Sequence, residues 1–264
     1  MAPRKRKFVT EVKAASQALD DGLPTENCLE KKKVSVVSSK YFTGKKEDSS
    51  RLESGFYNQP CISLAKALLG KIFVRRLADG TELRGRVVET EAYLGGEDKA
   101  SHSFGGKQTE RNVAMFMVPG TLYVYQIYGI YFCMNISSQG EGAAVLLRAL
   151  EPEQGQDRMR ELRDLRRKEN GKALKEHELC NGPSKLCQAL DINKRFDKRD
   201  LASDPDAWME HGPEAVSDTT VSSARIGVNY GEEWAKKPLR FYIQGNKCVS
   251  VVDKVAEAKM NAGS

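Results

Sequence analysis

The sequence has 264 residues, of which 40 % are hydrophobic, and carries a formal net charge of +6. This length and apolar content are enough for one large domain or two small ones with a substantial core. The chain has no run of about 18 apolar residues, and its start, MAPRKRK, lacks the apolar stretch of a signal peptide. We therefore expect a protein that neither spans a membrane nor is secreted.

The cysteines and histidines do not form a recognisable pattern. Six cysteines occur without a CxxC pair, and the chain has only three histidines. Zinc sites and disulfide frameworks need closer or more numerous ligands. We therefore predict reduced, mostly buried thiols, no metal ion and no cofactor.

Most of the excess positive charge lies in the N-terminal segment. Residues 1–54 hold 12 basic and 8 acidic residues, which leaves 30 and 28 for residues 55–264. Because this segment mixes Lys, Ser and Glu without a sustained period, we predict a disordered basic arm. The run RKRK at 4–7 fits a nuclear-import signal, a loose DNA-contacting arm or a merely solubilising tail. We predict localisation in the nucleus.

The first half of the remaining chain is predicted to consist mainly of strands. A short helix is predicted over 60–69, because Pro60 suits a first helical turn and Gly70 ends the apolar stripe. The period then changes, and KIFVRRL and ELRGRVVETEAYL flank a turn at 78–80, which predicts a hairpin. Further strands are predicted over 123–128, 132–137 and 143–150.

The second half begins with helices. The Arg, Glu, Met and Leu content of 153–169 favours a surface helix, and Gly182-Pro183 opens another in NGPSKLCQAL. After a polar stretch near 203–220, LRFYIQG and CVSVV (248–252) are predicted as a closing pair of strands. Strand runs with irregularly placed helices indicate the α+β class. We expect a single compact domain over 55–264, with a curved, mainly antiparallel sheet, surrounding helices and a frayed end of about ten residues.

The stretch VVETEAY, residues 87–93, is the first candidate for chemistry. Strict alternation without a bulge would place both glutamates and the tyrosine on one face. Like charges on one face repel each other unless solvent or arginines relieve them. One interpretation is an edge strand whose solvated Glu89 and Glu91 pair with Arg84 and Arg86. The other is a general base held near a water molecule.

Residues 101–112, SHSFGGKQTERN, are predicted to form a loop. The segment is rich in glycine, hydroxyl and basic residues and has no apolar pattern. Such loops supply amides and basic side chains to anions or base edges, or simply connect strands. His102 has no second histidine nearby, so we predict a substrate contact or a plain hydrogen bond and not a metal ligand.

The densest aromatic stretch is GTLYVYQIYGIYFCMNI, residues 120–136. Alternation places Tyr123 and Tyr125 on one face, and Gly129 lets Tyr128 project at a turn. Asn135 follows in a strand with apolar neighbours, where an unpartnered amide costs about 1–3 kcal/mol. Two of the tyrosines in this run are interpreted as ordinary core residues. The others, with the amide, predict a pocket for a flat ring with polar edges, such as a nucleobase.

Five segments resemble, in the same order, the alkyladenine DNA glycosylase family, the 3-methyladenine DNA glycosylases of the mammalian type. They are ELRGRVVETEAYLG, ASHSFGGKQTERN, MFMVPGTLYVYQIYGIYFCMNISSQGEGAAVLLRALEP, GPSKLCQAL and WAKKPLRFY. The resemblance implies a base-excision repair enzyme whose partner is double-stranded DNA with damaged purines. Such an enzyme flips an alkylated or deaminated purine (3-methyladenine, 7-methylguanine, hypoxanthine or ethenoadenine) into a pocket. It then hydrolyses the N-glycosidic bond and leaves an abasic site.

The resemblance also implies roles at matching positions. Glu91 is similar to the general base that orients or deprotonates water, and Arg148 and the backbone of Val228 are similar to the groups that help to hold this water. Three positions resemble the walls of the base pocket, two rings that stack and a histidine whose backbone meets the base edge: Tyr93, Tyr125 and His102.

Further matching positions concern selectivity and DNA contact. Asn135 is similar to the residue that crowds the amino group of normal guanine. Tyr128 is similar to the wedge that fills the gap left by the flipped nucleotide, and Ile130 lies beside it. Many family members have Pro where this chain has Glu110 and Met where it has Ile130, so the pocket loop and the residue beside the wedge are places where substrate preference can differ.

Neither Lys185 nor Lys107 is evident as a Schiff-base nucleophile, so we predict a monofunctional enzyme. Lys185 lies at a predicted helix start, where amides and the helix dipole favour anions, and is predicted to contact a DNA phosphate. We expect a monomer, with downstream repair proteins as further partners.

Two other functions fit the residues. A noncatalytic nucleic-acid-binding module would use the tyrosines to stack bases, with Glu91 in a structural role, and would retain DNA without releasing a base. A hydrolase of free nucleosides would share the pocket but have no use for a wedge at Tyr128.

Overall fold

The structure is a computed structural model that describes residues 50–165, 167, 172–213 and 219–262. The predicted arm over 1–54, with its basic run at 4–7, falls almost entirely outside the described residues. From Asp48 onward the chain forms one compact unit.

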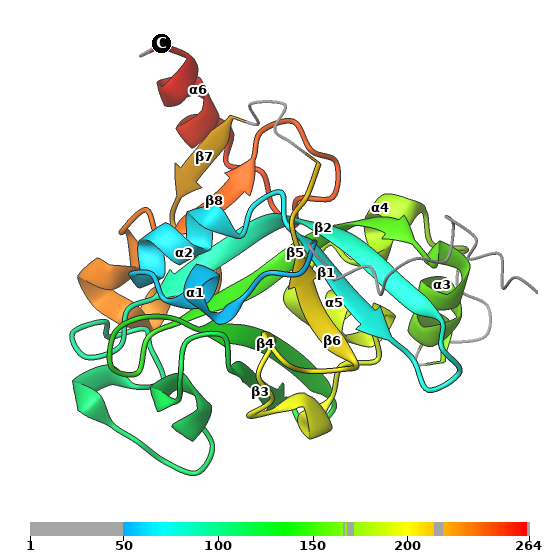
Figure 1. The fold of residues 1–264 in the computed structure, drawn as a ribbon. Helices are drawn as coiled ribbons and strands as arrows, with labels where there is room; N and C mark the ends of the chain where they lie inside the picture. The colour runs from blue at the N-terminus through cyan, green and yellow to red at the C-terminus, as the bar shows by residue number, and fades with distance from the viewer. Residues whose placement is uncertain (1–49, 166, 168–171, 214–218, 263–264) are drawn as a thin grey trace, which may run out of the picture. The chain divides into compact units, whose positions relative to one another are not determined.

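The described residues form a sheet of eight strands in which every pairing between strands is antiparallel (Figure 1). The order along the sheet is β3-β4-β5-β2-β1-β6, and β8 pairs with both β2 and β7. The strands are β1 Ile72–Arg76, β2 Glu82–Tyr93, β3 Leu122–Ile127, β4 Tyr131–Ser137, β5 Ala144–Gln154, β6 Ala207–Glu210, β7 Thr220–Ser223 and β8 Arg240–Ile243. The predicted α+β class with a mainly antiparallel sheet is confirmed.

Helices cover parts of this sheet. The α-helices are α1 Ser54–Tyr57, α2 Cys61–Ala67, α3 Gln156–Asp164, α4 Glu176–Leu179, α5 Pro183–Ala189 and α6 Lys254–Ala262, and the 3-10 helices are η1 Phe104–Gly106, η2 Val113–Phe116, η3 Lys194–Phe196 and η4 Asn229–Ala235. Helix α2 packs on β2 and β5, and α5 packs on β4 and β5. Pro183 occupies the first turn of α5, as predicted, because that turn leaves its N–H groups without helical partners.

Strand β2 is the centre of the sheet. It pairs with β5 along its length, with β1 over its first half and with β8 over its second half. A strand paired on both edges is shielded from solvent, and Val88, Glu89, Thr90 and Glu91 are fully buried. The interpretation of this segment as an edge strand is therefore wrong.

Strands β2 and β5 lose register at two adjacent points. Val87 pairs with Leu150 and Glu89 with Ala149, so Val88 is an extra residue on β2; the next pair skips Arg148 on β5. Strict alternation is therefore wrong at Val87, which packs in the main core with Ala92 instead of sharing the face of the glutamates. Bulges of this kind redirect side chains and are common next to active sites.

The end of the sheet differs from the prediction. CVSVV does not form a strand, because β8 takes its partners from β2 and from β7, at Thr220–Ser223. Strands β6 and β7 lie in or beside the stretch that was predicted to be only polar, and each has four residues. Helix α3 ends at Asp164, earlier than the predicted end of the surface helix near 169.

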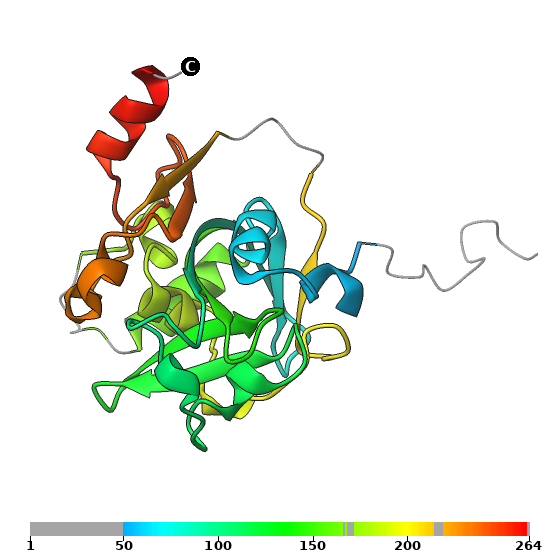
Figure 2. The ribbon, with the colours of Figure 1, turned by 90° about the vertical axis from the view of Figure 1, so that its left-hand side faces the viewer.

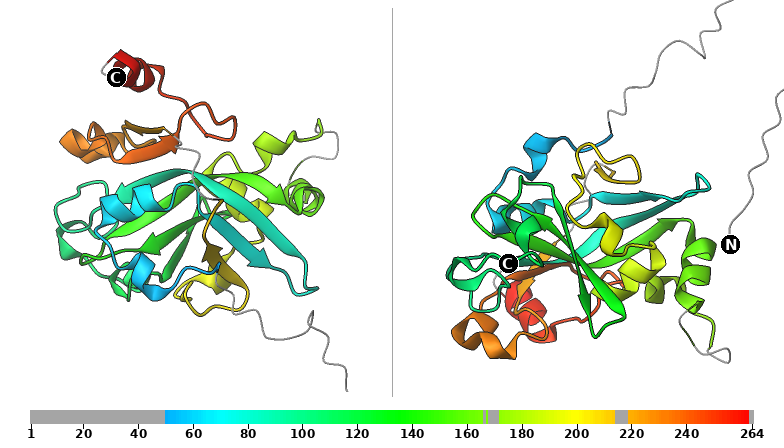
Figure 3. Two further views of the ribbon diagram at one scale, coloured as in Figure 1. Left: turned by 45° about the horizontal axis from the view of Figure 1, so that its top comes forward. Right: turned by 90° about the horizontal axis from the view of Figure 1, so that it is seen from below.

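The C-terminal elements gather on one side of this unit. Figures 2 and 3 show β7, β8 and α6 together, and α6 packs against β7. Where fraying was expected near the end, the structure has helix α6, whose Glu257 carboxylate accepts a hydrogen bond from the Tyr242 hydroxyl. Across the residues that the structure describes, no helix has the length and apolar character needed to span a membrane.

Candidate active site

The carboxylate of Glu91 lies at the middle of the sheet and accepts three hydrogen-bond or charged contacts. The Tyr93 hydroxyl donates to Oε2 at 2.9 Å, the Ile226 backbone N–H donates to Oε1 at 2.7 Å, and Arg148 Nη1 lies 3.2 Å from Oε1. An ionised carboxylate offers about four acceptor positions. Among the described residues, Glu91 therefore has one acceptor position without a partner, on Oε2, the oxygen that Tyr93 contacts.

Arg148 connects Glu91 to a second buried carboxylate. Its Nε lies 3.2 Å from Oε1 of Glu89, and the same oxygen lies 2.9 Å from Nη1 of Arg240. The Ser250 backbone N–H donates to the other Glu89 oxygen at 2.7 Å. Burial opposes the charged form of Arg148, but attraction to Glu91 and Glu89 outweighs this and raises the pKa of Arg148. The two carboxylates and two guanidiniums thus balance one another in the protein interior.

The expected pairing of the glutamates with Arg84 and Arg86 is wrong. Arg84 forms ion pairs with Glu82 and Glu210, and Arg86 with Glu151. Both arginines lie in the half of β2 that pairs with β1, whereas Glu89 and Glu91 lie beyond the bulge.

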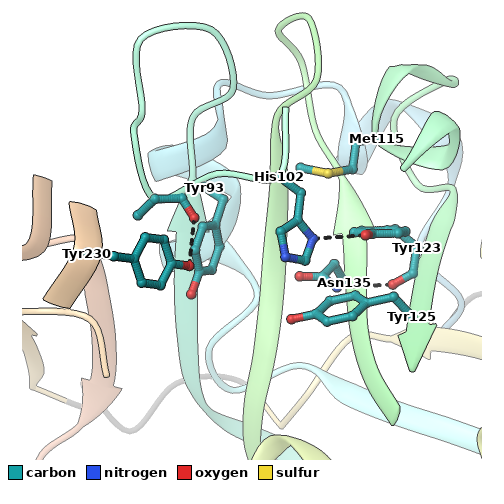
Figure 4. Close-up of a pocket in the computed structure, with 8 residues that line it drawn as sticks. Tyr93, His102, Met115, Tyr123, Tyr125, Asn135 and Tyr230 are labelled. Atoms are coloured by element: carbon teal, nitrogen blue, oxygen red, sulfur yellow. Dashed lines mark hydrogen bonds between the residues drawn. The ribbon is translucent and has the colours of Figure 1, made fainter. Parts of the chain in front are cut away.

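A pocket of about 310 Å³ opens beside this cluster (Figure 4). Burial and the charge of Glu91 raise the pKa of Tyr93, so its phenol remains a donor to the carboxylate. Tyr93 therefore belongs to both the pocket wall and the carboxylate site. The lining residues are Tyr93, Ala100, His102, Met115, Tyr123, Tyr125, Asn135 and Tyr230.

Three predicted wall residues come together in this pocket. The His102 ring lies edge-on to Tyr125, with 4.7 Å between ring centroids, and its Nδ1 lies 2.9 Å from the Tyr123 hydroxyl. Partial burial and the nearby charge of Arg111 lower the pKa of His102, which favours the neutral imidazole. The His102 carbonyl accepts a hydrogen bond from Asn112 Nδ2 at 3.0 Å. The loop that carries His102 is thus held by side chains on both its ring and its backbone.

Asn135 forms part of the same pocket from β4. It is buried, and its Nδ2 donates to the Tyr123 carbonyl at 3.1 Å. The polar partner that the sequence required for this amide is therefore the backbone of β3. Figure 4 shows Asn135 between His102 and Tyr125. Because one N–H of this amide is bound to the strand, its side-chain oxygen and its second N–H are the groups that could meet a ligand.

The β3–β4 turn lies apart from the pocket lining. Tyr128 is 88 % exposed and Ile130 is 55 % exposed, while the Ile130 N–H donates to the Ile127 carbonyl at 3.2 Å. Tyr128 has φ 50° and Gly129 has φ 72°. Positive φ places both residues in the left-handed region, which glycine or asparagine adopts with less strain than a tyrosine. Tyr128 therefore projects from a strained turn, as the position beside Gly129 predicted.

Val228 and Lys185 were also predicted to belong to the site. Val228 is buried, and its carbonyl accepts a hydrogen bond from the Gly231 N–H at 2.8 Å, whereas the neighbouring group that contacts Glu91 is the N–H of Ile226. Lys185 is exposed at the start of α5, where its Nζ donates to Asn181 Oδ1 at 2.8 Å, and is not one of the pocket-lining residues.

Comparison with known proteins places this geometry in a family. The model of the methylpurine-DNA glycosylase family matches residues 55–247. The chain belongs to this family. It is therefore a DNA glycosylase, an enzyme of DNA repair, and both the resemblance and the enzyme class expected from the sequence are confirmed.

Several relatives in the family are similar over most of this chain. The DNA-3-methyladenine glycosylase of Homo sapiens is 58 % identical over 90 % of this chain and 81 % of its own length. The mouse (Mus musculus) DNA-3-methyladenine glycosylase is 56 % identical over 97 % of this chain and 77 % of its own length. A putative 3-methyladenine DNA glycosylase of Clostridium perfringens is 42 % identical over 76 % of this chain and 98 % of its own.

Sequence reasoning missed several members of this glycosylase pocket. Met115 and Ala100 have no local feature that marks them, and Tyr230 lies in η4, outside every predicted strand and helix. The sequence did not decide whether Tyr123 is a core residue or a pocket residue. It has both roles, because its side chain is fully buried while its hydroxyl contacts the His102 ring. The one available signal was its spacing of two residues from Tyr125.

The predicted reduced, buried thiols can be compared with the described part of the chain. The five cysteines there are free and buried, and burial raises the pKa of Cys61 and of Cys248 to about 11. Among the same residues no cluster of His, Cys, Asp and Glu could hold a metal ion.

Proposed function

We propose that this glycosylase flips a damaged purine out of duplex DNA into the pocket and hydrolyses its N-glycosidic bond with a water held by Glu91. The observation that carries this proposal is the single unused acceptor position of Glu91, on the oxygen that also contacts Tyr93. A water bound at that position would lie beside a wall of the pocket. A carboxylate so placed can accept the water's proton and stabilise positive charge on the sugar, as in glycoside hydrolysis.

The ring contacts support an alkylated or deaminated purine as the flipped base. Tyr93 and Tyr125 line the pocket, and stacking of such a ring on an electron-poor base would contribute about 0.5–2 kcal/mol as a cation–π pair. Alkylation at N3 or N7 gives the purine such positive charge and makes it a better leaving group. The proposed substrates are 3-methyladenine, 7-methylguanine, hypoxanthine and ethenoadenine, and Asn135 would crowd the amino group of normal guanine.

The remaining site residues take supporting roles in this proposal. Arg148 would hold Glu91 and the water in place, and the Val228 backbone would limit where the water lies. Tyr128 would fill the gap left in the duplex, which offsets part of the few kcal/mol that base flipping costs. Ile130 would contact the DNA beside this wedge. Lys185 would contact a phosphate, so Lys185→Ala should reduce the salt dependence of DNA binding.

The enzyme would act as a monofunctional glycosylase, since a water and not a lysine attacks the sugar. Treatment with borohydride during the reaction should give no covalent protein–DNA adduct, because such an adduct requires a Schiff base. A trapped adduct would contradict this step.

The decisive experiment measures release of one base from duplexes that carry a single hypoxanthine or ethenoadenine. Strand cleavage after alkali would score the abasic sites, for the wild type and for Glu91→Gln. We expect release by the wild type and a rate lower by about 10²–10⁴-fold in the variant, with DNA binding retained. Equal rates in both proteins would move the role elsewhere, with Glu89 next. Retention of DNA by both without release would favour a noncatalytic binding module.

The cellular setting is part of the same proposal. We expect a monomer that works on nuclear DNA and passes abasic sites to downstream repair proteins. A reporter fused to residues 1–54 should accumulate in the nucleus, and an even distribution through the cell would contradict an import signal in the run at 4–7.

A further inference from the structure

The Arg225 guanidinium is buried beside the active site, and no step proposed above uses it. The side chains of Arg225 and Asp98 both have 0 % exposure. The pair is bidentate, with 2.6 Å between Nη1 and Oδ2 and 2.8 Å between Nη2 and Oδ1. Burial opposes the charge of Arg225, but the hydrogen bonds and attraction to Asp98 outweigh it and raise the pKa of Arg225. A charged pair in the interior is costly unless its geometry satisfies both partners.

This pair joins three segments that build the site. Arg225 Nη1 donates to the Ala92 carbonyl at 2.9 Å, between Glu91 and Tyr93 on β2, and Nη2 donates to the Trp234 carbonyl in η4 at 3.3 Å. Asp98 accepts the N–H groups of Leu94 and Ala100, both at 3.0 Å. Ala100 lines the pocket. One ion pair therefore fixes the end of β2, the loop before His102 and η4 relative to one another.

Arg225 contacts one of the two uncharged donors to Glu91 and is the chain neighbour of the other. Its guanidinium carbon lies 4.6 Å from the centroid of the Tyr93 ring, and Tyr93 donates to Glu91 Oε2. The next residue in the chain, Ile226, donates its N–H to Glu91 Oε1. A shift of Arg225 would move the ring through stacking and the N–H through the backbone. Both changes would alter the direction in which the unused position on Oε2 points.

We propose that Arg225 is a positioning residue for base release, which aligns the Glu91 carboxylate and the Tyr93 wall as one unit. The inference rests on the proposed function, because it assigns a role in the reaction attributed to Glu91. Arginine suits this task because its planar fork binds a carboxylate with two hydrogen bonds while its face stacks on an aromatic ring. Lysine offers the charge without the plane or the fork.

The test compares Arg225→Lys with a matched variant, Arg75→Lys. Arg75 is also buried, its guanidinium carbon lies 4.6 Å from the Phe196 ring centroid, and it pairs with Asp191. It lies on β1, which contributes none of the pocket lining identified in the described part of the chain. Both substitutions thus remove a buried guanidinium that lies over an aromatic ring, one beside the site and one away from it.

Three quantities would be measured for the wild type and both variants. They are the single-turnover rate of ethenoadenine release, the Kd for duplex containing a stable abasic analogue, and the fluorescence of bound ethenoadenine at 4 °C before release, which reports its stacking. We expect Arg225→Lys to slow release by about 10²-fold, since displacement of reacting groups by about 1 Å has that effect. Its Kd should change less than about threefold, and its fluorescence should differ from the wild type. Arg75→Lys should leave all three within about threefold.

Asp98→Asn provides a second variant that keeps Arg225 itself. It should slow base release less than Arg225→Lys and shift the fluorescence in the same direction. The reason is that one of the two hydrogen bonds between Arg225 and the Asp98 side chain is weakened. Equal slowing by Arg225→Lys and Arg75→Lys, or a loss of release matched by the loss of binding, would overturn the positioning role. Failure of the proposed function is a separate result, since it would show as no release by the wild type, and the fluorescence comparison needs no turnover.

Discussion

The carboxylate cluster on β2 and the tip of the β3–β4 hairpin belong to the same sheet and accommodate unfavourable groups in opposite ways. In the cluster, the buried carboxylates of Glu89 and Glu91 are each held by guanidinium and backbone donors. At the tip, Tyr128 is almost fully exposed and its backbone adopts a left-handed conformation. The charges of the cluster are compensated by their partners, so removal of one partner is costly, whereas the backbone of the tip keeps a conformation that itself costs free energy.

Removal of one carboxylate from the cluster on β2 should have the largest effect on stability. Glu89→Ala leaves the guanidiniums of Arg148 and Arg240 without their shared carboxylate. Loss of one partner from a buried pair costs about 3–5 kcal/mol, and we expect a decrease of that size in the free energy of unfolding. Urea denaturation would measure it. Glu161→Ala, which removes an exposed ion pair with Arg158, should change this free energy by less than about 1 kcal/mol.

The strain at the tip of the β3–β4 hairpin can be tested by replacing Tyr128. Tyr128→Gly removes the left-handed penalty, which is about 1–2 kcal/mol for a residue with a Cβ, although glycine returns part of this through chain entropy. We expect a gain in unfolding free energy of up to about 1 kcal/mol, together with roughly tenfold slower base release from loss of the stacked ring. A destabilised variant, or one with unchanged release from duplex DNA, would contradict the functional reason for the strain. Tyr128→Ala should show the same loss of release without the gain in stability.

The pocket wall can be tested through a single hydrogen bond. Tyr123→Phe keeps the buried ring but removes the hydroxyl that lies 2.9 Å from His102 Nδ1. A typical intramolecular hydrogen bond contributes about 0.5–1.5 kcal/mol, so the unfolding free energy should fall by about this amount. Tyr131→Phe, in the same hairpin, is a control for removing a hydroxyl and should have the smaller effect in the same urea titration.

The smallest expected effect is a dependence of stability on pH through His102. Its pKa in the folded protein lies below the ordinary value of about 6.5, so the unfolded chain binds the proton more readily. The contribution of the neutral ring is complete above about pH 6.5 and is lost as the pH falls through the folded-state pKa. Melting temperatures of wild type and His102→Gln from pH 8 to 5 would measure it, and their difference should decline on acidification. If the difference in melting temperature grew toward acidic pH, the pKa of His102 would be raised by folding and not lowered.

The elements with a local signal were predictable from the sequence. The β1–β2 hairpin, the tyrosine-rich β3 and β4, and the helix that Pro183 opens all carry turn residues or alternating apolar positions. Strand β6 carries neither, because it is defined by pairing with β1 across more than a hundred residues. CVSVV has the composition of a strand, but both edges of β8 pair with other strands, β2 and β7. Tertiary pairing therefore outweighs the local preference of this segment.

The site divides in the same way. Glu91, Tyr93, Arg148 and Tyr125 lie in segments whose residue types and family resemblance indicate chemistry, and the structure brings them together. Ile226 and Arg225 could not be inferred from their neighbours, because an N–H group and a buried cation become relevant only through the folding of distant segments. The irregularity that leaves Arg148 without a partner residue on β2 in the strand register could not be predicted for the same reason, since it is a property of two strands together.

The separation in sequence between Glu91 and its Ile226 donor affects how the enzyme is made. Ribosomes build a chain from its N-terminus, and early segments can fold before later ones exist. Strand β8 and the segment around Arg225 emerge long after β2, so the carboxylate lacks two of its supports during most of synthesis. A nascent chain shorter than 226 residues should therefore be unable to excise bases, and base release would begin only after the segment around Ile226 has been synthesised.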